Sequence, residues 1–267
     1  MVCIMWIHDI WVQLKELYRF RSLIQSLVIR ELKARYRGSI LGFLWSFLNP
    51  LLLISVYTLV FSIYFRFGMD HYVVFLFSGL LPWLWFSSSL QEASVSILAG
   101  GSLVKKVLFP VEVLPIVTVL SNLVNFLLGL PILILLSLLF GFKLHSVMLV
   151  LPLIMLIQLI FTLGLALMVS ALCVHFRDIQ HILANVLTLW FFVTPVIYRI
   201  LDIPEKWRFT IVLNPVASLI AAYHDIIYYG RAPNYYELAR VAIVGVVTYV
   251  VGHLIFEKLR GTFAEEI

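Results

Sequence analysis

Charged residues are scarce in this sequence. Only 12% of its 267 residues are Asp, Glu, Lys or Arg, whereas a water-soluble domain carries about 25%. Hydrophobic residues make up 63% of the chain. This composition excludes a soluble globular domain and a disordered chain. At about 20 apolar residues for each membrane crossing, the length allows several spans and leaves little room for a soluble domain.

Cysteines and catalytic motifs are also scarce. The two cysteines, Cys3 and Cys173, lie far apart, which argues against a disulfide framework and against a thiolate metal site. His175, Asp178 and His181 come nearest to a metal-ligand cluster, but residues six apart on a helix point to different faces, so we expect no metal site. The sequence has no D-x-D, H-E-x-x-H or G-x-x-x-x-G-K-[ST] motif. We therefore expect no catalytic residues and no nucleotide site of the P-loop kind.

Two further classes of membrane protein fit poorly. A lipid-linked glycosyl or phosphoryl transferase needs carboxylates near the membrane, yet Glu92 lies at the inner end of an apolar run and almost no other acid occurs in these runs. An ion-coupled transporter or channel places ionisable groups at mid-membrane, where Asn122, Asn125 and Gln158 are the only strongly polar candidates. Both classes are disfavoured.

Six long apolar runs predict an all-α, polytopic integral membrane protein. The transmembrane domain would cover residues 41–256, between a cytoplasmic interface region at 1–40 and a cytoplasmic tail at 257–267. The expected spans are approximately 41–64, 72–98, 113–140, 146–174, 182–198 and 240–256.

The basic residues predict the orientation. Six spans put both termini on one side, and most of the 19 Lys and Arg residues fall on inner segments if that side is the cytoplasm. This asymmetry accounts for the net charge of +5, so we expect no nucleic-acid partner. The first 20 residues lack the uncharged apolar block of a cleavable signal, and we expect none.

An amphipathic helix is expected before the first span. Apolar residues recur at approximately helical spacing over 10–32, with basic and polar residues on the other faces. This pattern is typical of a helix lying in the cytoplasmic membrane interface. Such a helix acts as an orientation anchor or as a docking element, and the sequence leaves both roles open.

Two inner segments are candidates for contact with a partner. A Gly-Gly break, paired lysines and two prolines make 100–115 a compact element, whose apolar residues fit a partner's groove or the membrane interface. In the segment 175–181 we expect Asp178 to cap or pair at the start of the next helix. The candidate contact residues are Leu103, Val104, Lys105, Lys106, Leu108, Phe109, Arg177 and Asp178.

The outer segment 199–237 is mostly apolar, which is unusual for a solvated loop. Residues 204–213 predict a short helix, and Asn214 followed by Pro215 fits the N-cap and first residue of a second helix that Gly230 would end. Neither helix can span the bilayer, so both would lie on its outer surface or dip into it, as a lid or as packing. The candidate residues are Pro204, Trp207, Asn214, Pro215, Tyr223 and Gly230.

Several short motifs recur in a fixed order along the chain, at 31–37, 48–50, 105–110, 114–115, 177–178 and 214–215, with Gly230 and Pro233. Together they resemble the permease subunit of ABC-2-type polysaccharide exporters, the group that includes O-antigen, capsule and teichoic-acid permeases. The likeness covers nearly the whole chain. Val111 stands where that group frequently has a basic residue, and His224 where it commonly has arginine.

The resemblance implies a half-transporter of the bacterial inner membrane that takes part in lipopolysaccharide biosynthesis. Two copies would pair around a central path above two separate ATPase subunits, which would bind the ATP and Mg, so that this chain binds no cofactor. The inner candidate residues would contact the ATPase, and the outer helix pair would form an exit gate. The cargo would be a lipid-linked, O-antigen-like glycan, with teichoic acid, capsule or a small amphiphile as alternatives.

Aromatic side chains are the candidates for lining the path. Tyr57, Phe61 and Tyr64 recur at helical spacing, a stripe that fits either an interfacial aromatic belt or the lining of a path. Aromatic rings can face the C–H surfaces of sugars without binding tightly enough to stall transit. The candidate path residues are Trp45, Tyr57, Phe61, Tyr64, Trp190, Phe191 and Tyr198.

Overall fold

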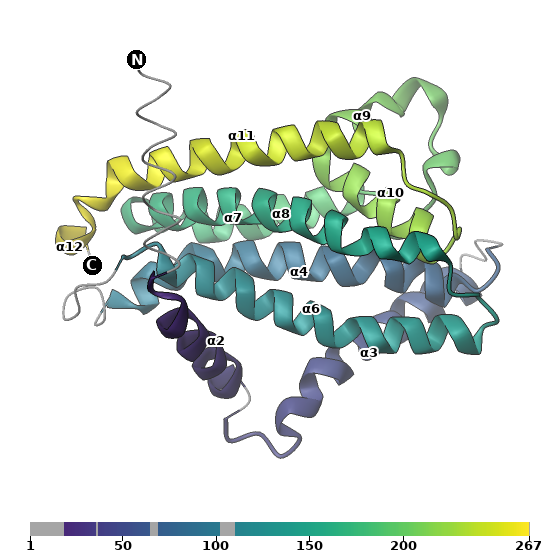
Figure 1. Cartoon of the computed structure of the whole chain (residues 1–267), viewed down its shortest axis with the longest axis horizontal. Helices are drawn as coiled ribbons and strands as arrows, with labels where there is room; N and C mark the ends of the chain where they lie inside the picture. The colour runs from purple at the N-terminus through teal and green to yellow at the C-terminus, as the bar shows by residue number, and fades with distance from the viewer. Residues whose placement is uncertain (1–18, 36, 65–68, 102–109, 267) are drawn as a thin grey trace.

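The computed structural model describes residues 19–35, 37–64, 69–101 and 110–266, and no strand occurs among them. The all-helical prediction is therefore confirmed for these residues. Two helices, α2 (Arg21–Arg35) and α3 (Trp45–Thr58), form a V against one side of a bundle of long helices (Figure 1). The bundle consists of α4 (Tyr72–Ala99), α6 (Val113–Leu139), α7 (Leu151–His175), α8 (Ile179–Val193) and α11 (Tyr235–Arg260).

Helix α4 forms the centre of the molecule. In its most apolar stretch 78% of the residues are buried, compared with 28–33% in α6, α7 and α11. It contacts α3, α6, α7, α8 and α10 (Pro215–Ile227), and it buries Phe75, Phe77 and Phe86 almost completely. The other long helices keep an apolar outer face, as helices that face lipid do.

Four segments are long and apolar enough to cross a membrane: α4, α6, α11, and α7 together with the 3-10 turn η3 (Ser146–Val150). Three of them agree with the expected spans to within a residue or two. Helix α11 begins at Tyr235, five residues earlier than expected. The Asn234 side chain accepts hydrogen bonds from the first amides of α11 and so fixes the start of the helix. Its first turns contain the ion pair of Glu237 and Arg240, and a search for apolar residues alone does not count these charged residues as part of the span.

The first and fifth expected spans contain shorter helices. After α3 the chain continues as the π-helix η2 (Leu59–Tyr64). Helix α8 has 15 residues, about 22 Å at 1.5 Å per residue, which is less than the roughly 30 Å hydrocarbon core. The expectation of helix to residue 198 is wrong, because Thr194 is extended and precedes Pro195, which disfavours helical backbone.

The predicted short helix at 204–213 is also corrected. The chain forms the 3-10 turns η4 (Ile200–Asp202) and η5 (Glu205–Trp207) and only then the five-residue α9 (Phe209–Leu213). The pair Glu205–Leu213 and Pro215–Ile227 bends by 101°. By length and composition the described residues contain four spans, or five if this bent pair counts as one.

One end of the bundle gathers α2, the start of α6 and the C-terminal α12 (Phe263–Glu266), at the left of Figure 1. The apolar face of α2, which includes Leu27, packs on Val113 and Val117 of α6. Arg260 of α11 lies 3.4 Å from the carboxylate of Glu112, which directly precedes α6. These contacts fix α2 and the end of α11 to the same helix.

Helices α7 and α11 touch through their backbones. A Cβ atom on Gly252 would overlap the carbonyl oxygen of Gly164, and one on Gly164 would lie 2.5 Å from the amide nitrogen of Tyr249. Only glycine permits this approach, which is a common way for membrane helices to pack closely.

We expect Gly252→Ala to destabilise the protein by about 3 kcal/mol, because the methyl group meets backbone that no rotamer change can move. Gly245→Ala is the matched control on α11, since its Cβ would be 3.5 Å from its nearest neighbour, an ordinary contact. Thermal unfolding in detergent measures both variants. Equal melting temperatures would contradict the close packing.

Candidate functional site

A cavity of about 520 Å³ lies between α3, α4 and α8. None of the described residues that line this α3/α4/α8 cavity is charged. Its polar groups are neutral hydroxyls and amides, and the rest of its wall is aromatic or aliphatic. A surface of this kind contacts amphiphilic molecules without strong electrostatic binding. The lining residues are Leu53, Tyr57, Leu80, Trp83, Leu84, Ser87, Ser88, Gln91, Ala184, Leu187, Thr188, Phe191 and Phe192.

Aromatic rings from three helices meet at this cavity. The ring centroids of Tyr57 and Phe191 are 6.0 Å apart, as are those of Tyr57 and Phe61. Trp83 lies 5.6 Å from Phe191. The structure thus brings together three of the predicted path residues. Sequence reasoning missed Trp83, although Ser87 and Gln91 follow it at four-residue spacing and mark the face of α4 that lines the cavity.

The other predicted path residues lie elsewhere. Trp45 is at the N-terminal end of α3, and the Tyr64 side chain is 72% exposed at the end of η2. Trp190 donates its indole N–H to Oδ1 of Asn214 at 2.9 Å. Tyr198 donates its hydroxyl to a main-chain carbonyl of α8. Their role in a path stays a prediction.

A polar cluster ties three helices together beside the V of α2 and α3. Arg35 of α2 donates to Glu92 of α4 at 2.6 Å and to Oδ1 of Asn122 of α6 at 3.2 Å. Asn122 also donates to the same Glu92 oxygen at 2.7 Å. Burial raises the pKa of the nearby Glu31 carboxyl, the Glu92 charge raises it further, and Arg35 lowers it. The carboxylate of Glu92 therefore balances the positive charge of Arg35.

Sequence reasoning noticed Glu92 and Asn122 only as isolated polar residues, and it counted Arg35 toward orientation and as part of the motif at 31–37. No spacing rule joins residues of three different helices. The one available signal was that a carboxylate in an apolar segment requires a cationic or hydrogen-bonding partner.

Asn214 organises the outer segment. Its Oδ1 accepts from the amides of Val216 and Ala217, and its Nδ2 donates to the hydroxyl of Thr194 at 3.0 Å. The predicted N-cap with Pro215 in the first turn is confirmed. Because Trp190 also donates to this residue, Asn214 joins the start of α10 to the end of α8.

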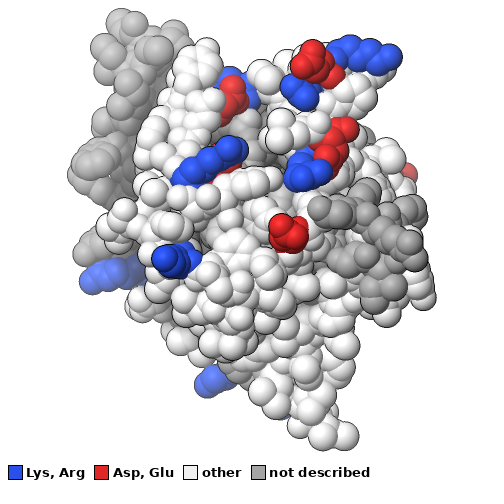
Figure 2. All heavy atoms as spheres, turned by 90° about the vertical axis from the view of Figure 1, so that its right-hand side faces the viewer, with Lys and Arg blue, Asp and Glu red and all other residues white. Residues whose placement is uncertain are grey.

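The charges of the outer segment are mostly paired. Figure 2 faces the end of the bundle at the right of Figure 1 and shows blue and red side chains next to one another, with neutral surface around them. Arg199 contacts Asp202 at 2.9 Å, and Arg231 contacts Asp225 at 2.7 Å. The hydrogen bond from Arg199 lowers the pKa of the Asp202 carboxyl.

The remaining outer candidates are placed as follows. Tyr223 is fully buried and Trp207 is half exposed. Gly230 follows α10 with a φ of +62°, a value that favours glycine. His224 is buried against α4: its ring stacks on Phe75 at 4.0 Å, and its Nε2 lies 3.1 Å from the carbonyl oxygen of Pro195.

The inner contact candidates are only partly visible. Leu103, Val104, Lys105, Lys106, Leu108 and Phe109 lie outside the described residues. Arg177 and Asp178 are exposed in the turn between α7 and α8. Asp178 precedes α8 but makes no capping hydrogen bond there, so the expected cap is wrong. In the described part of the chain no group of three or more His, Cys, Asp or Glu residues could hold a metal ion.

We expect Glu92→Gln to loosen α2, because glutamine keeps the shape and one acceptor but removes the charge that holds Arg35. The two side chains are 26% and 38% exposed, so the expected loss is about 1 kcal/mol, the upper end for surface pairs. Amide exchange in α2 should then be about fivefold faster. Asp178→Asn, which removes an exposed carboxylate from another turn, is the control. Unchanged exchange in α2 would show that the pair does not hold it.

Asn214→Ala should cost about 3 kcal/mol, from the lost cap and two lost hydrogen bonds in the interior. Asn234→Ala is the matched control, because Asn234 caps α11 through the same two amide positions. Asn234 is exposed, so its replacement should lower the free energy of unfolding by only about 1 kcal/mol. Thermal unfolding of both variants tests the difference. Equal losses would mean that Asn214 is a cap and nothing more.

Comparison with known proteins identifies the family of the chain. The profile of the family described as "ABC-2 type transporter" matches residues 22–228. The O-antigen export system permease protein RfbA of Myxococcus xanthus is 45% identical over 255 residues, which cover 95% of this chain and 98% of that protein. RfbA of Klebsiella pneumoniae is 36% identical over 94% of this chain and 98% of its own length. The polysialic acid transport protein KpsM of Escherichia coli is 25% identical over 86% of this chain and 90% of its own. The chain belongs to the ABC-2 type transporter family.

Proposed function

We propose that the chain is the permease subunit of an ABC exporter that moves a lipid-linked, O-antigen-like polysaccharide across the bacterial inner membrane. The observation that carries the proposal is the 45% identity to an O-antigen export permease along almost the full length of both chains. The family and these relatives are transport proteins, and the chain is a transport subunit rather than an enzyme.

The α3/α4/α8 cavity supplies the physical support for this cargo. A glycan that crosses a membrane needs a shielded route whose walls bind each sugar weakly, because a strong charge would hold the chain in place. Tyr57, Trp83 and Phe191 present aromatic rings there, while Ser87 and Gln91 supply neutral hydrogen-bonding groups. Such a wall suits sugars better than it suits ions.

The working assembly in this proposal is a homodimer with two copies of an ATPase subunit. Six spans with both termini in the cytoplasm make α2 an interface helix and put Arg177 on the ATPase side. The α3–η2 and α8 segments serve as the first and fifth spans beside the four longer ones. ATP and Mg bind to the ATPase, and the outer segment of α9 and α10 acts as the exit gate.

A capsular polysaccharide is the second candidate cargo. The likeness to the polysialic acid transport protein favours it, but at 25% identity this support is weaker. Teichoic acid and a small amphiphile remain alternatives that the same assembly could carry. Deletion of the gene separates these cargoes, since each predicts the loss of a different surface polymer.

Replacing Tyr57 and Phe191 together by alanine should reduce the export of surface glycan about tenfold, because two aromatic contacts with the moving chain are lost. The ATPase subunit should still co-purify with the variant. Leu52→Ala, which truncates an exposed side chain of α3, is the control. Normal export by the double variant would remove this cavity from the path.

A further inference from the structure

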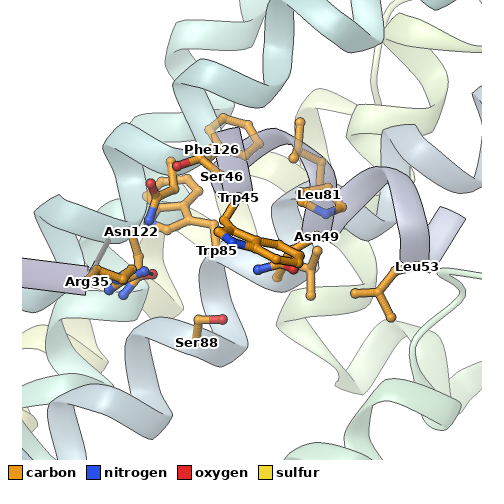
Figure 3. A pocket seen from close by; sticks show the side chains of 13 residues that line it. Arg35, Trp45, Ser46, Asn49, Leu53, Leu81, Trp85, Ser88, Asn122 and Phe126 are labelled. Carbon is orange, nitrogen blue, oxygen red and sulfur yellow. Dashed lines mark hydrogen bonds between the residues drawn. The ribbon is translucent and has the colours of Figure 1, made fainter. Parts of the chain in front are cut away.

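A second cavity, of about 170 Å³, lies between α3, α4 and α6 beside the polar cluster of Arg35 (Figure 3). Leu53, Leu84 and Ser88 line this α3/α4/α6 cavity and also the α3/α4/α8 cavity. The two cavities are therefore neighbours on either side of a shared wall. A molecule that left the smaller cavity past these side chains would enter the larger one.

Two polar groups of the lining have no partner within the described part of the chain. Trp85 is only 2% exposed, and its indole Nε1 makes no hydrogen bond there. Oδ1 of Asn125, which lines the same cavity, is also without a hydrogen bond. Buried polar groups of proteins are almost always paired. The residues that line the cavity thus include one unused donor and one unused acceptor, both of them buried.

The charge of the cavity argues against an anionic ligand. Among the described residues that line it, Arg35 is the only charged one, and this guanidinium is already paired with Glu92 and bonded to Asn122. A phosphate would have to compete with that carboxylate. A neutral ligand meets no such obstacle.

The shape and the lining suit a sugar ring. In Figure 3 Trp45, Trp85 and Asn49 lie together, with Arg35 and Asn122 to one side. Indole faces pack against the C–H surfaces of a pyranose, and the amides can bond its hydroxyls. A volume of 170 Å³ equals that of about six water molecules at roughly 30 Å³ each, the scale of a single sugar ring.

We propose that the α3/α4/α6 cavity binds one neutral sugar ring of the cargo before the glycan enters the α3/α4/α8 cavity. Trp85 donates its N–H to one sugar hydroxyl, and Asn125 accepts a hydrogen bond from another. The wall formed by Leu53, Leu84 and Ser88 separates this loading position from the path. The inference rests on the proposed export of a glycan and adds to it a defined site of recognition.

Photolabelling of the purified complex with its ATPase, in lipid nanodiscs, tests the proposal. Two probes carry the same alkyl chain and a diazirine beside the head group, one with a glucoside head and one with a phosphate. We expect the glucoside probe to label peptides that contain Trp45 or Trp85, and an excess of unlabelled alkyl glucoside to displace it. The phosphate probe should not label them.

Trp85→Phe keeps an aromatic ring and removes the N–H, so labelling should fall about fivefold, the effect of one typical hydrogen bond. Leu52→Ala is the control, because Leu52 is an exposed residue of α3 that lines neither cavity. If Trp85→Phe does not insert as a monodisperse protein, Asn49→Ala replaces it with the same expected loss, since Asn49 is an exposed residue of the lining.

Three results would overturn the proposal: no displaceable labelling by the glucoside probe, equal or stronger labelling by the phosphate probe, or labelling that neither variant reduces. These results are distinct from a failure of the export function. If the gene can be deleted without any loss of surface glycan, the export proposal fails. If labelling is absent in a complex that restores surface glycan in cells, only the loading site fails.

Discussion

A polar side chain inside a membrane-spanning bundle has no water to bond, so its partner must come from the protein. This constraint decides how the helices of the chain are joined. Gln158 of α7 donates to the carbonyl of Pro82 in α4 at 2.9 Å. Arg35 joins α2 to α4 and α6, and Asn214 joins α10 to α8. Each tie crosses between helices that apolar contact alone would leave free to slide.

The distribution of charge along the molecule follows from the same constraint. Charges gather at the two ends, where Arg260 and Glu112 form one pair and Arg199 and Asp202 another. Between these ends none of the described residues that line the α3/α4/α8 cavity is charged. A neutral polymer would therefore contact aromatic rings, hydroxyls and amides along this stretch. It would meet no charged side chain that binds it strongly enough to stop its movement.

Part of the fold could be predicted from local properties of the sequence. The lengths of α4, α6 and α7 follow from apolar runs, and the N-cap at Asn214 follows from an Asn-Pro pair. The limits of α8 and α11 could not be predicted in this way. Pro195 ends α8 before its apolar run ends, and the cap at Asn234 starts α11 at charged residues that lie before its apolar run. An apolar run gives the length of a helix but not its partner.

The candidate site was less accessible to prediction for a related reason. Tyr57 and Phe61 could be singled out because they share a face of one helix. Trp83 and Trp85 were not singled out, since α4 is buried on nearly every side and its apolar run does not show which helices the two rings contact, although Ser87 and Gln91 mark the face on which Trp83 lies. Arg35, Glu92 and Asn122 come from three helices, and only the tertiary structure brings them within hydrogen-bonding distance.

The contact between Gly164 and Gly252 has a mechanical consequence. Where two backbones touch, there is no flexible side chain to absorb sliding or rotation, so α7 and α11 must move as one rigid unit. Helices α3 and α8 lack such a contact among the described residues, and α3 continues into the wider turns of η2. In the proposed path, the widening that lets a bulky polymer through would then fall to α3 and α8, while α7 and α11 would stay fixed.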